Sequence, residues 1–600
     1  MVNGPQHLRR AARTGARLLA AAALLAVTGC GRTGPAPAPP PAAPAPPAVV
    51  RTDADVTAFG GSAACAPCHA REHATWARST HATHGSFAVR PDEGADGAVG
   101  SKWMQAYVRR DATGLSRIVP RCFDLRERRW LEVSSVLAEI AGRFGETPDV
   151  APAPMPTPLT RRTFETDCAG CHASQPTTSL DVEHGRLVSA HVEASIGCEA
   201  CHGPGRAHVE AWRAARTDAP MPRLGTLAPR ASLAACTRCH GGPPTASDFA
   251  PADADAYVAW VADRRGTFPD GRAAGQVYQG QGLLASPCHR AGGLVCTDCH
   301  DAHGPGLRAE GDALCVRCHR DAASTAHTHH APAGDGARCL SCHMPRLLPG
   351  LLAHQRDHRI SVPLPADRTT PDACTACHRD HDKTWADEAW RRLWGEPPAG
   401  TVEVVAALAR ARGGHVDRDA LRRGLGHADP IVRANAARAL GDATSLVGDP
   451  VPEVRLACVD ALPRNAAGDA ALARLLGDAE PKVRAAAALS AALRGSVAGG
   501  TVADADLVTF TRLTRQDPWS RLALAERARR RGDAAGAARW SLAAFLADPL
   551  ERGPAATAAS DLLAAGDATT ARAVLRAAIA LEPDEDDRAR LRALLARTER

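Results

Sequence analysis

The 600-residue sequence has little of what marks several common classes of protein. Aromatic residues make up only 4% of the chain, with three tyrosines, which is low for an interior of this size. The 72 basic and 66 acidic residues leave a formal charge of only +6, so the composition does not indicate a nucleic-acid binder. Beyond residue 30 no apolar run is long enough to span a membrane. Something other than aromatic side chains is therefore expected to fill part of the interior.

The sequence is instead rich in one motif, Cys-x-x-Cys-His, which occurs eight times. Three copies lie within residues 296–343, and five others surround them. The motif cysteines are Cys65, Cys68, Cys168, Cys171, Cys198, Cys201, Cys236, Cys239, Cys296, Cys299, Cys315, Cys318, Cys339, Cys342, Cys374 and Cys377. The motif histidines are His69, His172, His202, His240, His300, His319, His343 and His378.

The spacing of this motif suits covalent haem attachment. Thiols at positions i and i+3 share one face of a helical turn and can form thioethers with the two vinyl groups of a haem, and the next residue offers an imidazole to the iron. Zinc ribbons and disulfides are the alternatives, but neither explains a histidine at the same position in every copy. We therefore predict eight covalently attached haem c groups. Their flat apolar macrocycles would replace the missing aromatic side chains.

The N-terminus reads as an export signal. Four arginines precede an apolar run, Leu18–Val27, that is too short to span a bilayer. The run ends in Val-Thr-Gly-Cys30, which resembles a bacterial lipobox and implies cleavage before Cys30 and acylation of its thiol. An ordinary signal peptide with an incidental cysteine is the alternative. We expect a lipoprotein signal peptide at 1–29, then the lipidated cysteine and a Pro/Ala-rich linker at 30–58.

These features predict a lipid-anchored protein on the periplasmic or cell-surface face of the bacterial outer membrane. Export agrees with the haem motifs, because c-type cytochromes are assembled outside the bacterial inner membrane. Gly31, rather than aspartate, after the acylated cysteine resembles outer-membrane sorting signals.

Residues 59–388 carry further elements beside the haem motifs. They are Trp76-x-x-Ser-x-His81, Gly197 to His208 with its Gly-Pro-Gly-x-x-His ending, Cys299-His-Asp-Ala-His303, Cys342-His-Met-Pro345, Arg356-Asp-His358 and Asp372 to His378. Together they resemble the multihaem cytochromes of the cytochrome c-554 and hydroxylamine oxidoreductase type, whose larger relatives continue into tetratricopeptide repeats. The resemblance implies an octahaem cytochrome c domain in which the extra histidines ligate neighbouring haems.

A count of histidines agrees with this implication. Residues 59–388 contain fourteen outside the motifs, more than the eight that eight bis-His haems require. Those in matching elements are favoured as second iron ligands: His81, His191, His208, His303, His330 and His358. For any one of them a surface or hydrogen-bonded role is the alternative. General methionine ligation is disfavoured, because the chain has five methionines in all.

The composition changes to alanine, arginine and leucine near residue 389. Pro430-Ile-Val-Arg433 recurs as Pro452 to Arg455 and as Pro481 to Arg484, which predicts HEAT-like helical repeats at 389–500. Gly532-Asp533 recurs 34 residues later at Gly566-Asp567, which predicts tetratricopeptide-like repeats at 501–600. Such a solenoid would offer a surface for protein docking, or it would only cap the haem domain.

The expected fold class is therefore mainly α with extensive irregular structure, a haem-packed cytochrome domain followed by an α-helical solenoid. Little regular structure is expected between the haem motifs, except hairpins in Lys102–Val133 with a turn at Asp111–Gly114. Cys458 is expected to be a small core residue. Cys122 and Cys288 could form a disulfide in an exported protein, and the sequence leaves this open.

Two classes of function compete. The first is an electron carrier with mostly bis-His haems, which binds redox partner proteins and no nucleic acid. The second is a multihaem oxidoreductase acting on a small nitrogen or sulfur compound at a five-coordinate haem. The carrier is favoured, because no Cys-x-x-Cys-Lys motif is present and Tyr107, Tyr257 and Tyr278 match no element of the hydroxylamine oxidoreductases. A third interpretation makes the haems structural and the solenoid the functional part.

Overall fold

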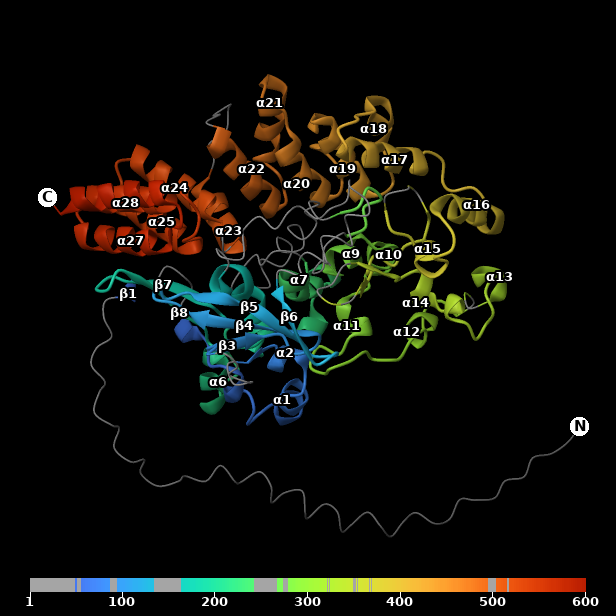
Figure 1. The fold of residues 1–600 in the computed structure, drawn as a ribbon, viewed down its shortest axis with the longest axis horizontal. Helices are drawn as coiled ribbons and strands as arrows, with labels where there is room; N and C mark the ends of the chain where they lie inside the picture. The colour runs from blue at the N-terminus through green and yellow to red at the C-terminus, as the bar shows by residue number, and fades with distance from the viewer. Residues whose placement is uncertain are drawn as a thin grey trace, which may run out of the picture. The chain divides into compact units, whose positions relative to one another are not determined.

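The computed structural model is mainly helical with little sheet, as the sequence predicted (Figure 1). It describes Val49, Val50 and residues 56–86, 94–133, 163–241, 267–273, 279–348, 352–494 and 503–599, apart from 321, 323, 353, 366, 368, 369, 515 and 516. The predicted signal peptide, Cys30, most of the linker, Tyr257 and Tyr278 lie outside the described residues. None of the described helices is both long and apolar enough to cross a membrane.

Short helices carry the haem motifs and the segments between them. Many are a single turn, as expected where a motif dictates local structure rather than a long amphipathic pattern. The helices up to residue 377 are α1 (Ala70–Trp76), α2 (Thr80–Thr83), α4 (Ala169–His172), α5 (Glu199–His202), α6 (Arg206–Arg213), α7 (Pro229–His240), α9 (Gln279–Ala285), α10 (Pro287–Gly292), α11 (Cys296–Cys299), α12 (Ala313–Val316), α13 (Thr325–Thr328), α14 (Cys339–Cys342) and α15 (Ala373–Cys377).

The largest sheet lies between the first and second motifs and is antiparallel, in the order β2-β3-β4-β5-β6. Its strands are Gly85–Ser86, Gly97–Val99, Met104–Arg110, Ser116–Asp124 and Arg129–Glu132. Strands β4 and β5 pair with Val108 opposite Ile118, and the chain reverses at residues 111–115, where Gly114 has φ 88°. The hairpins predicted in Lys102–Val133 are thus confirmed.

Two smaller sheets were not predicted from the sequence. One has the order β1-β7-β8, with strands Val49–Val50, Thr177–Asp181 and Arg186–Ala190. The other pairs β9 (Arg346–Leu348) with β10 (Gln355–Arg356). The strands of both sheets are short, β7–β8 and β9–β10 pair segments that are close in the chain, and only the pairing of β1 with β7 joins segments that are distant in sequence.

From residue 383 the described part of the chain is a succession of helices. They are α16 (Lys383–Trp394), α17 (Thr401–Arg412), α18 (Arg418–Gly424), α19 (Pro430–Leu440), α20 (Pro452–Ala461), α21 (Ala466–Leu475), α22 (Pro481–Arg494), α23 (Asp504–Leu513), α24 (Pro518–Arg530), α25 (Ala534–Ala547), α26 (Pro554–Ala564), α27 (Ala568–Leu581) and α28 (Glu585–Thr598). We call residues 383–599 the helical region and the described residues 56–378 the haem region.

The 34-residue sequence period corresponds to repeated helix starts. Gly532 and Gly566 have φ values of 72° and 85°, a left-handed conformation that glycine adopts without steric cost. The aspartate after each glycine then caps a helix: Asp533 accepts from the Gly536 N–H at 2.8 Å, and Asp567 from the Thr570 N–H at 3.0 Å. The repeat therefore has a structural basis in the turn, although the repeat families stay predictions.

Alanine allows these helices to pack closely and form their own cores. One core joins α19 to α22 and contains Val454, Cys458 and Leu475, with Cys458 only 1% exposed. The expectation that Cys458 is a small core residue is confirmed. A second core, around the fully buried Phe545, joins α25, α26 and α27.

The helical region also packs against the haem region. The Phe545 core includes Leu115, Leu180 and Leu187, which belong to or adjoin the strands β5, β7 and β8. Further along the helices, Arg230 of α7 pairs with Glu453 of α20 at 2.6 Å. The helical region therefore covers part of the haem region, and these contacts do not decide whether it also binds partner proteins.

Candidate haem-binding site

Each haem motif forms about one helical turn, as its spacing predicted. In six motifs the backbone N–H of the histidine donates to the carbonyl of the first cysteine at 2.8–3.0 Å. In the other two motifs the histidine ends a helix, at His172 of α4 and His240 of α7. This turn places both cysteines on one side of the backbone, where they can reach a common group.

The motifs converge on one continuous cavity of about 3060 Å³. All eight motif histidines line it, together with every motif cysteine except Cys68. Pockets for single small molecules measure roughly 300–1,000 Å³, so this cavity has room for several large groups. Its walls also carry Leu283, Leu314 and Trp390. An apolar cavity with thiol pairs and imidazoles along its walls fits a set of covalently attached haems.

The imidazole rings supply a second test of that fit. Metal–nitrogen bonds of roughly 2.0–2.1 Å place two opposed imidazole nitrogens about 4 Å apart, and the ring centres, each about 1.2 Å behind its nitrogen, roughly 6.4 Å apart. Five motif histidines have a second histidine at this separation: His240 with His81 at 6.4 Å, His202 with His303 at 6.1 Å, His300 with His358 at 6.4 Å, His343 with His327 at 6.0 Å and His378 with His330 at 6.1 Å.

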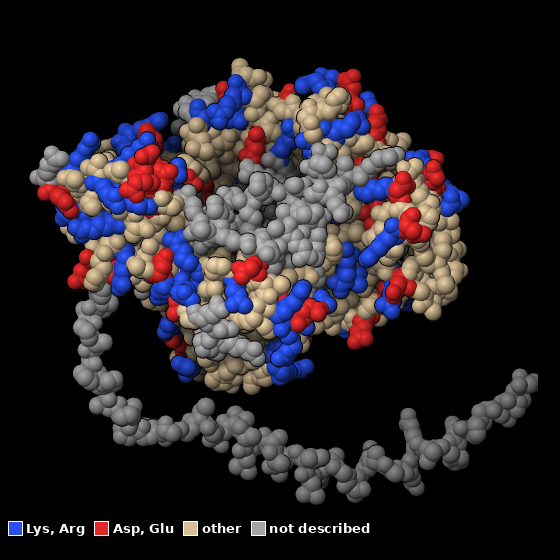
Figure 2. All heavy atoms as spheres, in the orientation of Figure 1, with Lys and Arg blue, Asp and Glu red and all other residues tan. Residues whose placement is uncertain are grey.

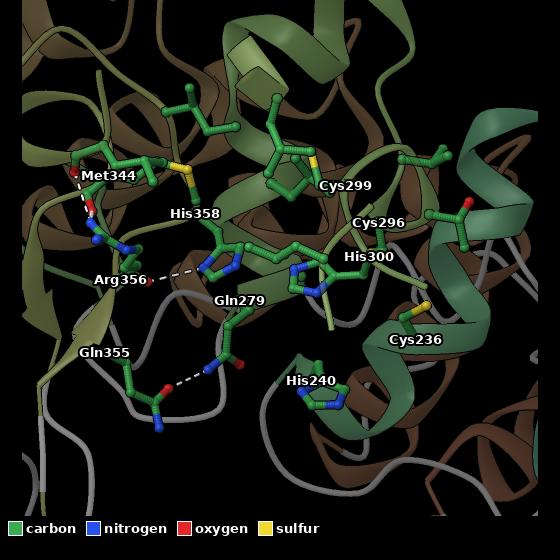
Figure 3. A pocket seen from close by; sticks show the side chains of 18 of the residues that line it. Cys236, His240, Gln279, Cys296, Cys299, His300, Met344, Gln355, Arg356 and His358 are labelled. Atoms are coloured by element: carbon green, nitrogen blue, oxygen red, sulfur yellow. Dashed lines mark hydrogen bonds between the residues drawn. The ribbon is translucent and has the colours of Figure 1, made fainter. Parts of the chain in front are cut away.

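Several of these imidazoles are oriented by backbone carbonyls. The Nδ1 atoms of His202, His343 and His358 lie 3.0 Å from the carbonyls of Pro222, Ser361 and Arg356, and His330 Nδ1 lies 2.5 Å from Thr328 O. An Nδ1–H that donates to a carbonyl leaves the lone pair on Nε2, the arrangement common in metal-ligating histidines. Figure 3 shows His300 and His358 with their rings directed toward one another.

Burial keeps three of the imidazole rings that line the cavity neutral, the form that can bind a metal. It lowers the pKa of His240 and His358 to about 4, and the pKa of His172 to about 3. These histidines are uncharged at neutral pH, so binding iron would displace no proton from the coordinating nitrogen.

Four of the six favoured second ligands face a motif histidine: His81, His303, His330 and His358. His208 lines the cavity, with its Nδ1 2.9 Å from Ala219 O, but within the described residues no motif histidine ring is its partner. His191 follows β8 and is not among the residues that line the cavity. Whether any of these residues binds iron stays a prediction.

The structure adds three histidines that the sequence analysis did not favour. One is His381, whose ring centre lies 6.4 Å from that of His378, so that His378 has two candidate partners, His330 and His381. His327 faces His343 at 6.0 Å, and His84 stacks on His172 with ring centres 4.2 Å apart, too close to hold an iron between them in this arrangement. His327 lies in the run His327-Thr-His-His330, where sequence alone could not separate the candidates. The end of helix α13 separates them: His327 lies on the helix and faces His343, whereas His330 follows the left-handed His329 beyond its end and faces His378.

Two sets of hydrogen bonds join the segments around the first and third motifs. The buried carboxylate of Glu199, inside the third motif, accepts N–H groups of Gly61 and Gly205 at 2.7 Å and of Gly60 at 2.9 Å. Trp76 Nε1 donates to Ile196 O at 2.9 Å, and the Ser79 side chain caps helix α2, which carries His81. In the element Trp76-x-x-Ser-x-His81, Trp76 therefore bonds to the segment before the third motif, Ser79 caps helix α2, and His81 lies on that helix.

Neighbouring motifs approach one another closely enough for their thiols to interact. Hydrogen bonds between motifs join Cys65 to Cys198, Cys171 to Cys239 and Cys236 to Cys296, and shift the pKa values of the two thiols of each pair in opposite directions. Electrostatic contacts join Cys201 to Cys236, Cys299 to Cys318, Cys315 to Cys339 and Cys342 to Cys377. The thiols of each motif thus interact electrostatically with the thiols of at least one other motif.

The remaining cysteines and the zinc alternative can be assessed where the structure describes them. Cys122 is buried on β5, where its thiol contacts Leu131 O at 3.6 Å, and Cys288 lies on α10; both thiols are free, with no disulfide between them. Among the described residues no three His, Cys, Asp or Glu side chains converge as a metal site would require.

Comparisons with known proteins add little. No family model matches the chain, and no curated protein matches it. Among solved structures, the crystal structure of the outer cell wall cytochrome OcwA is similar over 69% of this chain and 99% of that chain, with 16% sequence identity and a TM-score of 0.39. So low a TM-score carries no argument about function, which has to be made from the motifs and the cavity.

Proposed function

We propose that this protein is an octahaem c-type cytochrome that transfers electrons through a chain of mostly bis-His haems. The observation that carries the proposal is the convergence of all eight motif histidines on one cavity, with five of them facing a second imidazole at 6.0–6.4 Å. Two imidazoles on one iron leave no position for a substrate, so electron transfer is the chemistry that such pairs favour.

Haem c supplies one-electron redox chemistry when bound, and the chain's own residues determine where it takes place. The cysteine pairs fix each macrocycle to its helical turn. The carbonyl-bound imidazoles fix the ligand geometry and exclude other ligands. The adjacency of the motifs, from Cys65–Cys198 to Cys342–Cys377, supports transfer between neighbouring haems. Low potentials are expected, because bis-His ligation lacks the methionine that raises them.

The test is to count and characterise the haems. Intact mass after acid and organic extraction should exceed the mature polypeptide by eight haem masses. Low-spin spectra without response to carbon monoxide, nitrite or hydroxylamine are expected for most haems. A protein that lacks covalent haem, or one whose haems are mainly high-spin, would overturn the proposal.

The cellular setting is also part of the proposal. Acylation of Cys30 would hold the protein at the outer membrane, on its periplasmic or cell-surface face, and redox partner proteins would dock there, with the helical repeats as one docking surface. Mass spectrometry of the membrane fraction should show an acylated Cys30 as the first residue. Recovery of Cys30→Ala in the same fraction with an unmodified terminus would contradict the anchor.

A second candidate function, a multihaem oxidoreductase acting on a small nitrogen or sulfur compound, rests on His69 and His319. Within the described residues no second imidazole ring pairs with either motif histidine, and both are exposed. A haem held there could keep an open position for a small ligand. A high-spin ferric signal that shifts with nitrite or hydroxylamine and is removed by Cys315→Ser/Cys318→Ser would support this candidate.

A further inference from the structure

The helical region contains a ladder of buried Arg–Asp pairs between successive repeats. Arg433 of α19 pairs with Asp449, which precedes α20, at 2.8 and 2.9 Å. Arg455 of α20 pairs in the same way with Asp478, which precedes α22, at 2.7 and 2.8 Å. In each pair, then, the arginine of one helix bonds to the aspartate that precedes the first helix of the next repeat.

The aspartate that begins this ladder has its partner outside the repeats. Asp429 precedes α19 and caps it by accepting the Ile431 N–H at 2.8 Å, but its other carboxylate oxygen accepts from Arg359 of the haem region. Both side chains are 9% exposed. Arg359 also donates from Nη1 to the carbonyl of Asp270 at 3.0 Å, just as Arg455 donates to the carbonyl of Asp449 at 2.8 Å. The haem region thus supplies the first arginine of the ladder.

Arg359 directly follows His358, which faces the fifth-motif histidine His300 at 6.4 Å (Figure 3). The segment around it is tightly packed. A Cβ placed on Gly282 of α9 would lie 3.1 Å from the His358 carbonyl carbon, and one placed on Gly271 would lie 2.6 Å from Arg359 Nη1 and 3.3 Å from Ile431 Cβ. A shift of the Arg359 guanidinium would therefore be transmitted to the backbone that carries His358.

We propose that Asp429 is a positioning residue, which holds His358 in line with His300 through Arg359, so that the helical region sets the ligation of one haem. The proposal rests on the proposed function, because it requires a haem between these two histidines. Removing the carboxylate would take away the ion pair of a buried guanidinium and leave only the electrostatic attraction of Asp270 and Asp357 to balance its charge, which is unfavourable. The guanidinium would then move toward water and take the adjacent His358 with it.

The ladder offers a matched control. Asp429→Asn retains an oxygen that can cap α19 but removes the charge that pairs with Arg359, and Asp449→Asn makes the same change one repeat later, where the partner is Arg433. Both full-length holoproteins would be compared with the unmodified one by haem content, EPR, carbon monoxide binding to the reduced form and redox titration.

We expect unchanged haem content in both variants and a lowered thermal midpoint in both. Only Asp429→Asn should show a new high-spin ferric signal, binding of carbon monoxide to one haem and a raised potential for one component of the titration. Asp429→Glu, which restores the carboxylate, should return the low-spin spectrum. If Asp429 only stabilised the fold, Asp429→Asn and Asp449→Asn would change the haem spectra alike. A change in the Asp429→Asn spectra alone therefore indicates that Asp429 positions His358.

Identical spectra and titrations for Asp429→Asn and Asp449→Asn would overturn the inference while leaving the proposed function intact, since the haem content of the unmodified protein tests that separately. If Asp429→Asn does not accumulate, the double variant Arg359→Gln/Asp429→Asn removes both buried charges and is expected to fold. The double variant should also bind carbon monoxide at one haem. If it binds none, the inference is equally overturned.

Discussion

The haem region and the helical region fill their interiors by different means. In the haem region the buried apolar clusters are small, such as the one around Val99, Val108 and Phe164, and they surround a cavity of about 3060 Å³. In the helical region alanine, leucine and valine side chains pack directly, as around Phe545 and Val574, both fully buried. The low aromatic content of the chain therefore has two causes: haems would replace large side chains in one region, and alanine packs helices closely in the other.

This difference means that only one region should depend on its cofactor for folding. The haem region lacks the side chains to close its cavity, whereas the cores of the helical region are built mostly from its own helices, with Leu115, Leu180 and Leu187 of the haem region added to one of them. Charge does not distinguish them: basic and acidic side chains are interspersed over the face drawn in Figure 2.

The largest expected effect is the loss of the haem region when haem attachment is prevented. In the full chain produced without haem, residues 56–378 should exchange amide hydrogens at nearly unfolded rates, because an apolar cavity of this size cannot persist in water. Helices α19 to α27 should keep slow exchange. Hydrogen exchange with mass spectrometry measures both at once. Equal protection in the two regions would contradict the comparison.

Removing a core side chain from the helical region should have the next largest effect. Phe545→Ala deletes a fully buried ring, and such changes cost about 3–5 kcal/mol of unfolding free energy. Denaturant unfolding followed by far-UV circular dichroism would measure the loss. Leu563→Ala on the adjacent helix is the control: with 42% of Leu563 exposed, it should change stability by about 0.5 kcal/mol or less. The low-spin haem spectrum should be unaffected by either change.

Opening one predicted ligand pair should alter a single haem and leave the helical region intact. His327→Ala removes the ring that faces His343 at 6.0 Å, so one haem should become high-spin and bind carbon monoxide after reduction. The control is His184→Ala, since His184 pairs with Asp181 and does not line the cavity. An unchanged EPR spectrum for His327→Ala would show that His327 is not an axial ligand.

The smallest expected effect is the pH dependence of stability that comes from Asp548, which lies where the helical region contacts the haem region. Burial raises the pKa of Asp548, at the end of α25, from 3.8 to about 6. As the pH falls from 7 to 5, the folded protein takes up a proton that the unfolded chain does not bind until near pH 4, so stability should rise by about 1 kcal/mol from this group. Asp548→Asn should remove that part of the pH dependence. Equal slopes for both proteins in urea titrations between pH 5 and 7 would contradict it.

Most of the local structure was predictable from the sequence. The helical turns of the motifs follow from spacing, because the i and i+4 atoms that bond are close in the chain. The β4–β5 hairpin and the 34-residue helix period also follow from local patterns of turn residues and apolar side chains. The three-stranded sheet was missed, because it pairs residues 49–50 with residues 180–181 and no local signal specifies that register.

The candidate site was predictable in its cysteines and motif histidines but only partly in its second histidines. His303 was favoured from its element and faces His202, a motif a hundred residues earlier. His327 was not favoured, although it faces His343. Nothing in the sequence distinguishes His327 from its neighbours His329 and His330 as a second ligand. Their separation depends on where helix α13 ends and on the left-handed turn at His329, which direct His327 and His330 to different motifs in the folded chain.

The sequence by itself determined the chemistry that this protein can hold: eight thiol pairs, each with its imidazole, and a helical region able to form its own core. These depend on residue type and short spacing, which act through bonds and turns within a few residues. The tertiary structure alone decided which imidazoles face each other, which motifs are neighbours and that Asp429 meets Arg359. Those contacts join residues that are distant along the chain, and packing selects them only when the whole fold is assembled.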